Sequence, residues 1–375
     1  MSRAPECGGI RIRMGTKTLS TATIRDVAQK AGVSQSTVSR VLNKTGYVSA
    51  ATRARVLRAV ESLDYSPSAI AVGLSKSRSR IIGVIVPQIF SPFFSELFYT
   101  ADKIAEQYDY RLLLCNSDAS AERERRLIDD LLSYKIAALF ITPVEGPEGG
   151  NTAYLNSIRR SGIPVVCVDR EPEGIACDGV YIDNFGACYE ATREVLEHGW
   201  RNIAYMADPP IYAPGRQRLQ AFEAACREFG AAVPPENRML APIEAVQTRE
   251  AFLREIVHRA HPPKAIINFS KGWDAAMLRT ITSAGLRVPE DIFLTGLDDD
   301  GALQAYGYYT NYTPGTPTVA TAAANLLMER TLCTGPLPAP VRNAIRTHLK
   351  TFLKPGAALP APDVPPAGPN TTKQG

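Results

Sequence analysis

The sequence predicts an α/β protein with two parts: a small N-terminal head of three helices in a helix-turn-helix arrangement, and a much larger two-lobed domain built on parallel sheets. The length of 375 residues, 45% of them hydrophobic, allows two or three domains with a large core. Charge separates the two parts, because residues 1–80 carry 14 Lys and Arg against 4 Asp and Glu, while the rest carries 28 against 34. Beyond residue 80, short apolar runs alternate with amphipathic helical segments, which is typical of parallel sheets.

The composition argues against several classes of protein. No apolar run approaches the ~20 residues that span a bilayer, so we expect no membrane partner. Residues 1–22 lack the apolar core of a signal peptide, which favours a cytoplasmic protein with a disordered N-terminal extension. The cysteines are scattered without a Cys-x-x-Cys pair, so we expect buried apolar side chains rather than a disulfide framework or a structural zinc. They are Cys7, Cys115, Cys167, Cys177, Cys188, Cys226 and Cys333.

The first two helices are predicted by apolar residues at helical spacing between polar end signals. Thr23 and Asp26 have the spacing of a capping box, Gly32 is a stop signal, and Ser34 can cap a second helix. The apolar positions are Ile24, Val27, Ala28, Ala31, Val38, Val41 and Leu42. Two short helices joined by a turn that contains glycine are typical of a helix-turn-helix.

A third helix is predicted from Ser49, and it completes a small core for the head, residues 23–65. Its expected inward side chains are Val56, Leu57, Val60 and Leu63. Arg53, Arg55 and Arg58 remain outside, where the positive charge of the head suits a polyanion. Two simpler interpretations stay open: the basic end could be a solvated tail, and the helical stripes could belong to an ordinary three-helix bundle.

Residues 22–74, ATIRDVAQKAGVSQSTVSRVLNKTGYVSAATRARVLRAVESLDYSPSAIAVGL, resemble the headpiece of the lactose/purine repressor (LacI) family almost residue for residue. The resemblance implies that Gln35, Ser36 and Arg40 contact DNA bases. It also implies contacts with the phosphate backbone for Thr23, Ser34, Thr37, Asn43 and Tyr47. The chemistry agrees, because Arg donates a fork to guanine, Gln matches adenine, and hydroxyl groups suit phosphate oxygens.

A hinge is expected over residues 66–80, which combine serines, a proline and basic residues. Its apolar segment Ala69–Leu74 is far shorter than the ~12 to 15 residues that an isolated helix needs, so it should be disordered without DNA. The resemblance makes it a helix that folds as a pair in the minor groove, with Ala71 beside Leu74, which matches the family's leucine wedge. Val72 and Gly73 replace the family's usual Arg and Ser, which weakens this inference; a passive tether stays open.

The domain over residues 81–354 is predicted to contain two doubly wound lobes, since its apolar runs are too many for one open sheet. These runs, expected to be strands buried on both faces, are Ile81–Val86, Tyr110–Cys115, Ile136–Ile141, Ile163–Val168, Ile203–Met206, Ala265–Asn268 and Ile292–Leu297. By resemblance, this is the family's ligand-sensing and dimerisation domain, similar to periplasmic sugar-binding proteins.

Ligands of such sheets bind beyond the carboxyl ends of the strands. That rule selects Gln88–Phe94, Asp169, Arg170, Asn268–Lys271 with Ser270, Asp298 and Asp299, joined from a helix start by Arg216 and Arg218. Phe93, Phe94 or Trp273 could cover a ring face. By resemblance, Asp169 and Asp298 match the two ligand aspartates and Arg218 the ligand arginine.

Two departures limit this transfer. Ser270 and Lys271 stand where the family usually has Asn and Asp, and the stretch Tyr312–Leu332 is shorter than the family spacing. The ligand could therefore be unusual, for instance anionic, or the site could have decayed. Residues 355–375 are rich in Pro, Ala and Gly, so we expect a disordered tail there.

The leading interpretation is a DNA-binding transcription regulator, expected to be a repressor that binds a pseudo-palindromic operator as a homodimer and responds to a sugar or sugar derivative. A tetramer stays open. The alternative is a soluble sugar receptor, which the basic head disfavours. We expect neither an enzyme nor a cofactor, because no catalytic triad, metal-ligand spacing or phosphate-binding glycine loop is found.

Overall fold

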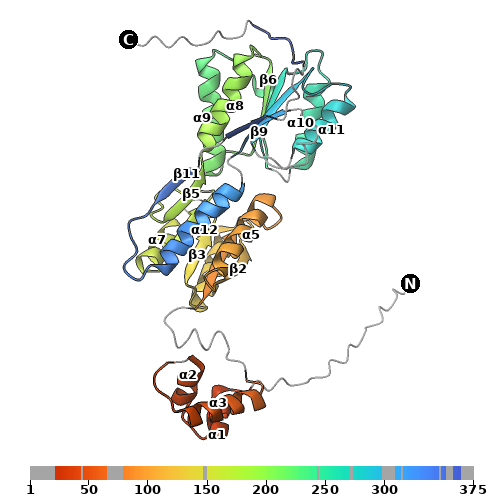
Figure 1. Ribbon diagram of the computed structural model, residues 1–375. Coiled ribbons are helices and arrows are strands. Elements are labelled where there is room, and N and C mark those ends of the chain that lie inside the picture. Colours follow the sequence, from red (N-terminus) through yellow and green to blue (C-terminus); the bar gives the residue numbers. More distant parts are fainter. Residues whose placement is uncertain are drawn as a thin grey trace, which may run out of the picture. The chain divides into compact units, whose positions relative to one another are not determined.

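The computed structural model describes residues 22–43, 45–65, 79–146, 150–242, 245–270, 273–297, 309–313, 316–345, 348–351 and 358–364. The chain divides into two compact units between Lys76 and Ser77 (Figure 1). The first unit is the head and the second contains both lobes.

The head consists of α1 (Ile24–Ala31), α2 (Gln35–Asn43) and α3 (Ala50–Ser62). At the start of α1, the Thr23 side chain accepts from the backbone of Asp26, whose carboxylate accepts from Thr23 N–H at 2.7 Å; this is the predicted capping box. Gly32 ends α1 with φ of +64°, a left-handed conformation that favours glycine. The helix-turn-helix is therefore set by local signals at both ends of its first helix.

The head core is correctly predicted except at Leu57, which is 49% exposed. Ala59 is buried instead, because it lies three residues after Val56 and on the same helix face. The buried residues are Val27, Ala28, Ala31, Val38, Val41, Val56 and Ala59.

The first lobe is a six-stranded sheet between two helical layers. Its strands, in sheet order, are β11 (Arg342–Ile345), β5 (Asp178–Ile182), β4 (Val165–Val168), β3 (Ala138–Ile141), β1 (Ile81–Val86) and β2 (Arg111–Asn116). One face packs against α5 (Pro92–Glu106) and α12 (Thr316–Leu332), and the other against α6 (Ala121–Ser133) and α7 (Thr152–Arg160). The described strand pairs of this sheet are all parallel.

The second lobe repeats this three-layer plan (Figure 1). Its sheet order is β12 (His348–Thr351), β10 (Tyr309–Thr313), β9 (Phe293–Leu297), β8 (Ala265–Phe269), β6 (Ile203–Ala207) and β7 (Arg238–Leu240). One face packs against α8 (Asn184–Glu197) and α9 (Ala213–Glu228), and the other against α10 (Val246–Val257) and α11 (Asp274–Ser283). A short 3-10 helix, Pro235–Asn237, precedes β7.

Several strand predictions need correction. The run Tyr110–Cys115 forms an edge strand, β2, whose Leu113 and Leu114 are each 38% exposed, so it is not buried on both faces. β12 is antiparallel to β10, so the second sheet is not wholly parallel. The strands that were not predicted are β5, β7, β10, β11 and β12. They are short or polar, and most lie at or near a sheet edge, where a continuous apolar run is not required.

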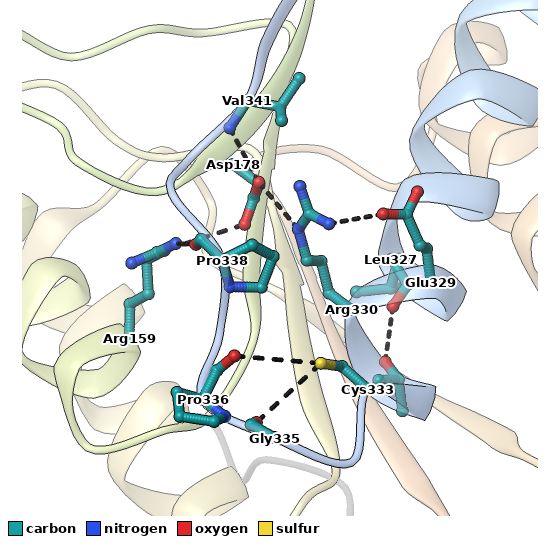
Figure 2. Close-up of polar contacts among 11 residues, drawn as sticks. Arg159, Asp178, Leu327, Glu329, Arg330, Cys333, Gly335, Pro336, Pro338 and Val341 are labelled. Atoms are coloured by element: carbon teal, nitrogen blue, oxygen red, sulfur yellow. Dashed lines mark hydrogen bonds and ion pairs between the residues drawn. The ribbon is translucent and has the colours of Figure 1, made fainter.

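Asp178, at the start of β5, ties three segments of the first lobe together (Figure 2). Its Oδ1 accepts hydrogen bonds from Arg330 Nε at 3.1 Å and from the backbone N–H of Val341 at 2.9 Å. Its Oδ2 lies 3.8 Å from Nε of Arg159, which also donates to the carbonyl of Pro338. Asp178 is 0% exposed, so the two guanidinium groups offset the cost of burying its charge. The loop between α12 and β11 is thereby fixed to the amino edge of the sheet.

Residues 358–364 pack on the second lobe, which corrects the expectation of a disordered tail from residue 355 for this segment. Trp200 Nε1 donates to the carbonyl of Pro360 at 3.0 Å. The carboxylate of Asp363 accepts two backbone N–H groups at 2.7 and 2.9 Å, and its own N–H donates to Gly199. Composition suggested disorder, but here specific side chains satisfy the backbone and bury apolar surface.

The cysteine prediction holds for most of the described thiols. Cys115 is half-buried because it lies on the edge strand β2, and Cys333 is exposed beyond α12. The buried ones are Cys167, Cys177, Cys188 and Cys226. Within the described ranges, no helix combines the length and apolar character needed to cross a bilayer.

Candidate nucleic-acid interface and effector site

Helix α2 presents the three predicted base-contacting residues to solvent. Gln35, Ser36 and Arg40 are all exposed, while Val38 and Val41 of the same helix are buried in the head core. The packing that buries one face therefore leaves the other free to enter a groove. Arg40 can donate two parallel hydrogen bonds to a guanine edge from this position.

Two of the predicted backbone contacts, Ser34 and Thr37, lie at the start of α2. The Ser34 hydroxyl lies 2.8 Å from the Ser36 hydroxyl and 2.9 Å from that of Thr37, so these groups are preorganised at a helix N-terminus, which favours phosphate. Thr23 donates its hydroxyl to Asp26 at 2.7 Å, and a contact with phosphate would compete with that bond. Tyr47 is 93% exposed.

Three predicted DNA contacts are not described at the level of side chains. Asn43 is the last residue of α2, and its side chain lies outside the description. Ala71 and Leu74 of the expected hinge fall outside the described residues.

A pocket of about 400 Å³ contains Asp169 and is lined by both lobes. Asp169 has φ of +68°, a left-handed conformation that Asp tolerates better than most residues, directly after β4. The lining residues are Asp169, Glu171, Tyr181, Ile182, Asp183, Phe185, Ala213, Pro214, Gln217, Arg342 and Ala344. Arg342 donates to Glu171 on one side of the pocket. Carboxylates, an amide and two aromatic rings thus surround a space that fits a small polar molecule.

Three buried polar atoms of the described residues that lack hydrogen-bond partners lie at the carboxyl edge of the first sheet: Oδ1 of Asn116, Oγ1 of Thr142 and Nη1 of Arg170. Two others, Nε of Arg159 and Oδ2 of Asp178, face each other at the amino edge. The first three residues end or follow β2, β3 and β4. Because an unsatisfied buried polar group costs about 1 to 3 kcal/mol, the gathering of these three at the carboxyl edge favours a polar ligand there.

Arg218, the predicted ligand arginine, is buried and serves within its own lobe. Its Nε donates to Oδ1 of Asn184 at 2.9 Å and its Nη1 donates to the carbonyl of Phe269 at 3.0 Å. It thus joins α9 to the start of α8 and the end of β8. Arg216, two residues earlier, is exposed and donates to the carbonyl of Ile211 at 2.6 Å.

Four residues, Glu145, Arg170, Tyr212 and Arg216, form a clasp between the two lobes. Glu145, after β3, accepts from Arg216 Nη2 and from the N–H of Ala213, at 2.6 and 2.7 Å. Arg170 stacks on the ring of Tyr212 at 3.8 Å. Helix α9 has no side-chain cap of its own, so a carboxylate of the other lobe caps it.

Glu124 supports the loop that carries this clasp. Its two carboxylate oxygens accept from the N–H of Val144 and from Nδ2 of Asn151, each at 2.8 Å. Burial raises the pKa of Glu124 from 4.5 to about 7, against the lowering effect of these hydrogen bonds and of Arg170. Because Val144 precedes Glu145, the position of the clasp depends on Glu124.

Three more predicted effector residues, Phe93, Phe94 and Ser270, do not line this pocket. Phe93 and Phe94 are 5% and 8% exposed and pack in the first-lobe core, because Pro92 starts α5 and its first turn faces the sheet. Ser270 is 1% exposed. Asp298 lies outside the described residues.

Sequence reasoning missed several polar residues around the site. Asp208 directly follows β6, so the strand-end rule that selected Asp169 would also have found it. Arg249 lies inside α10 and gave no comparable signal, although it is fully buried beside Asp208. Glu145 follows β3 within a loop, and its partner in the second lobe is visible only in three dimensions.

Comparison with known proteins places both units in one family. Residues 23–68 match the family model "Bacterial regulatory proteins, lacI family". Residues 79–301, more than half of the chain, match "Periplasmic binding proteins and sugar binding domain of LacI family".

Individual relatives cover most of the chain. The HTH-type transcriptional repressor PurR of Aliivibrio fischeri (strain MJ11) is 30% identical over 313 residues, which span 82% of this chain and 91% of that protein. The HTH-type transcriptional regulator KdgR of Bacillus subtilis (strain 168) is 29% identical over 329 residues, spanning 85% and 93%.

Solved structures give the same result. A transcriptional regulator CelR–cellobiose complex aligns with a TM-score of 0.62 at 28% identity, covering 88% of this chain and 98% of that one. The lac repressor dimer bound to operator and the anti-inducer ONPF aligns with a TM-score of 0.73 at 21% identity, covering 89% and 99%, a likeness of fold. The chain belongs to the LacI family of bacterial regulatory proteins.

Proposed function

We propose that this protein is a transcriptional repressor that binds a pseudo-palindromic operator as a homodimer and is controlled by a small-molecule effector, a sugar or sugar derivative. The observation that carries the proposal is the exposed face of α2, with Gln35, Ser36 and Arg40, on a basic head joined to a two-lobed domain. The similarity to the repressor PurR, the regulator KdgR and the transcriptional regulator CelR in complex with cellobiose supports it.

In this proposal the head, residues 23–65, positions α2 in the major groove. Arg40 and Gln35 contact base edges, while the hydroxyl groups around the start of α2 and Tyr47 contact phosphates. Two heads related by two-fold symmetry require two half-sites arranged as an inverted repeat. Residues 66–80 act as the hinge, and the protein works in the cytoplasm at the nucleoid, where operator DNA is found.

The effector acts by changing the population of lobe arrangements. It binds beside Asp169 and the unsatisfied polar atoms of the first sheet, next to the clasp between the lobes. A ligand that prefers one arrangement shifts the population toward it, and that arrangement favours or disfavours the paired hinges. The effector needs only a higher affinity for one lobe arrangement than for the other.

The test uses the full chain and a pool of random duplexes. Repeated selection should enrich an inverted repeat, and the purified protein should bind it as a dimer with far higher affinity than a scrambled duplex of equal length. Binding of both duplexes with equal affinity at moderate salt, or selection of a site without two-fold symmetry, would contradict the proposal.

A further inference from the structure

The second lobe presents a carboxylate at its ligand edge that differs from the expected contact. Asp208 directly follows β6 and Ser270 directly follows β8, and these two strands are neighbours in the sheet. The side chains therefore lie together at the carboxyl edge, where ligands of such sheets bind. Ser270 Oγ donates to Oδ1 of Asp208 at 2.8 Å.

Ser270 is not available to an effector. It is 1% exposed, its single hydroxyl hydrogen is donated to Asp208, and its oxygen accepts from Nη1 of Arg249 at 2.5 Å. The hydroxyl thus acts as a spacer between an arginine and a carboxylate. A hydrogen-bonding group for a ligand at this edge must therefore come from a residue next to Ser270.

Arg249 anchors this arrangement from inside the lobe. Its side chain is 0% exposed, and it donates to Oδ1 of Asp208 at 2.8 Å and to the carbonyl of Pro242 at 3.0 Å. It also donates to the carbonyl of Ala241. A buried guanidinium is costly unless it is hydrogen-bonded and paired, so these bonds hold the ends of β6, β7 and β8 in a fixed geometry.

The second oxygen of Asp208, Oδ2, accepts no hydrogen bond from the described residues. Its side chain is 38% exposed, and no described residue donates to Oδ2, whereas Oδ1 is occupied by both Arg249 and Ser270. An ionised carboxylate only accepts hydrogen bonds. An oxygen fixed in this way matches a hydroxyl group of a ligand and repels a carboxylate or phosphate.

We propose that Asp208, positioned by Arg249, is a specificity-determining residue of the second lobe that accepts a hydrogen bond from a hydroxyl group of a neutral, polyhydroxylated effector. This inference rests on the proposed function, because it assumes that an effector binds between the lobes. It assigns the contact to Asp208 rather than to Ser270, and it favours a neutral sugar over the anionic ligand that the sequence left open.

The test compares Asp208→Asn with Asp291→Asn in the full chain. Asp291 is a matched control, since it lies in the same lobe, pairs with Arg287 at 3.0 Å, and precedes β9 at the opposite edge of the sheet. Both variants and the wild type are titrated calorimetrically with neutral mono- and disaccharides, with the matching aldonic and uronic acids, and with sugar phosphates.

We expect a neutral saccharide to be the tightest ligand of the wild type. Its affinity should fall by roughly tenfold to a hundredfold in Asp208→Asn, because the amide presents a donor in place of an acceptor, and stay within about twofold in Asp291→Asn. An acidic member should gain affinity relative to the neutral one. Asp208→Glu keeps the charge beside Arg249 and should fold, but it moves the acceptor oxygen and should also weaken binding.

The proposal is overturned if the tightest ligand is an acid or phosphate, if no panel member binds the wild type, or if its ligand binds both Asp208 variants as tightly as the wild type. Operator binding without ligand is measured on the same samples. If the wild type bound the operator no better than a scrambled duplex, the proposed DNA function would be contradicted. The saccharide titrations test the role of Asp208 alone.

Discussion

Arg40 is the single residue on which sequence recognition should depend most directly. It is exposed on α2, and its guanidinium can distinguish guanine from the other bases. Arg40→Ala should lose roughly 1 to 3 kcal/mol of discrimination at one base pair per half-site. Fluorescence anisotropy with single-base variants of the selected operator measures this loss.

The control for this prediction is Arg55→Ala, which removes a positive charge that is also exposed, from α3. It should weaken binding to all duplexes by a similar factor. If Arg40→Ala also weakened every duplex equally, Arg40 would be a phosphate contact rather than a base contact.

Glu124 should make stability depend on pH. Its pKa is about 7 in the folded protein and 4.5 without burial, so between these values only the folded carboxyl holds its proton. Stability therefore falls as the pH rises through this range and is level above it. At about 1.4 kcal/mol per pH unit, the loss is on the order of 3 kcal/mol. Glu124→Gln cannot ionise and should lack this dependence.

Urea unfolding between about pH 5 and pH 8 measures the effect of Glu124 on the free energy of unfolding. Glu122→Gln is the control, because Glu122 lies on the same helix but is exposed and bonded to Arg126. Equal pH slopes for wild type and Glu124→Gln would show that another group is responsible.

At the scale of elements, we expect the segment 358–364 to stabilise the second lobe. A chain that ends at residue 357 loses the bond from Trp200 to Pro360 and the hydrogen bonds of Asp363. Removing one buried hydrogen bond and some buried apolar surface should lower the free energy of unfolding by about 2 kcal/mol. For a domain of this size the Tm should fall by roughly 4 to 8 °C.

Tryptophan fluorescence locates this change, because the chain has two tryptophans and Trp273 is buried in the core on the other face of the second sheet. The truncated chain should show red-shifted emission from Trp200, and the shift should disappear in a Trp200→Phe background. An unchanged Tm and unchanged emission would mean that the segment contributes nothing to the second lobe.

The elements that could be predicted from sequence are those whose burial leaves a pattern. Strand β1 was predicted at its observed bounds, Ile81–Val86, because a central strand of a parallel sheet is apolar on both faces. β11 and β12 were missed because strands at a sheet edge tolerate residues such as Arg342 and Lys350.

The candidate site follows the same logic. Asp169 was selected because it follows a recognisable strand, and it lines the pocket; its contact with an effector stays a prediction. Arg249 could not be found, since nothing in a helical sequence shows that one arginine faces inward to bind Asp208. The Ser270 hydroxyl is likewise occupied by hydrogen bonds with Asp208 and Arg249. These bonds could not be predicted, because they depend on the pairing of β6 with β8.

At the scale of the whole molecule, the carboxyl and amino edges of the first sheet carry different groups. The carboxyl edge holds Asp169, the unsatisfied atoms of Asn116, Thr142 and Arg170, and the clasp. The amino edge receives the chain at Ser79, and the network of Asp178 fixes the loop beside it (Figure 2). In the proposed function, an effector at the carboxyl edge acts on residues 66–80 through this lobe.

The charge distribution of the whole molecule makes the last prediction. Positive charge is concentrated in residues 1–80, and the rest of the chain is net acidic. Operator binding should therefore depend steeply on salt, because each phosphate that is neutralised releases counterions. With about six to ten phosphate contacts per dimer, affinity should fall by roughly 10³ to 10⁵ between about 50 and 200 mM salt.

A fragment of residues 79–364 should not bind duplex at any of these salt concentrations, yet should bind the saccharide that binds the full chain. A shallow salt dependence, or duplex binding by the fragment, would show that the head is not the main DNA contact.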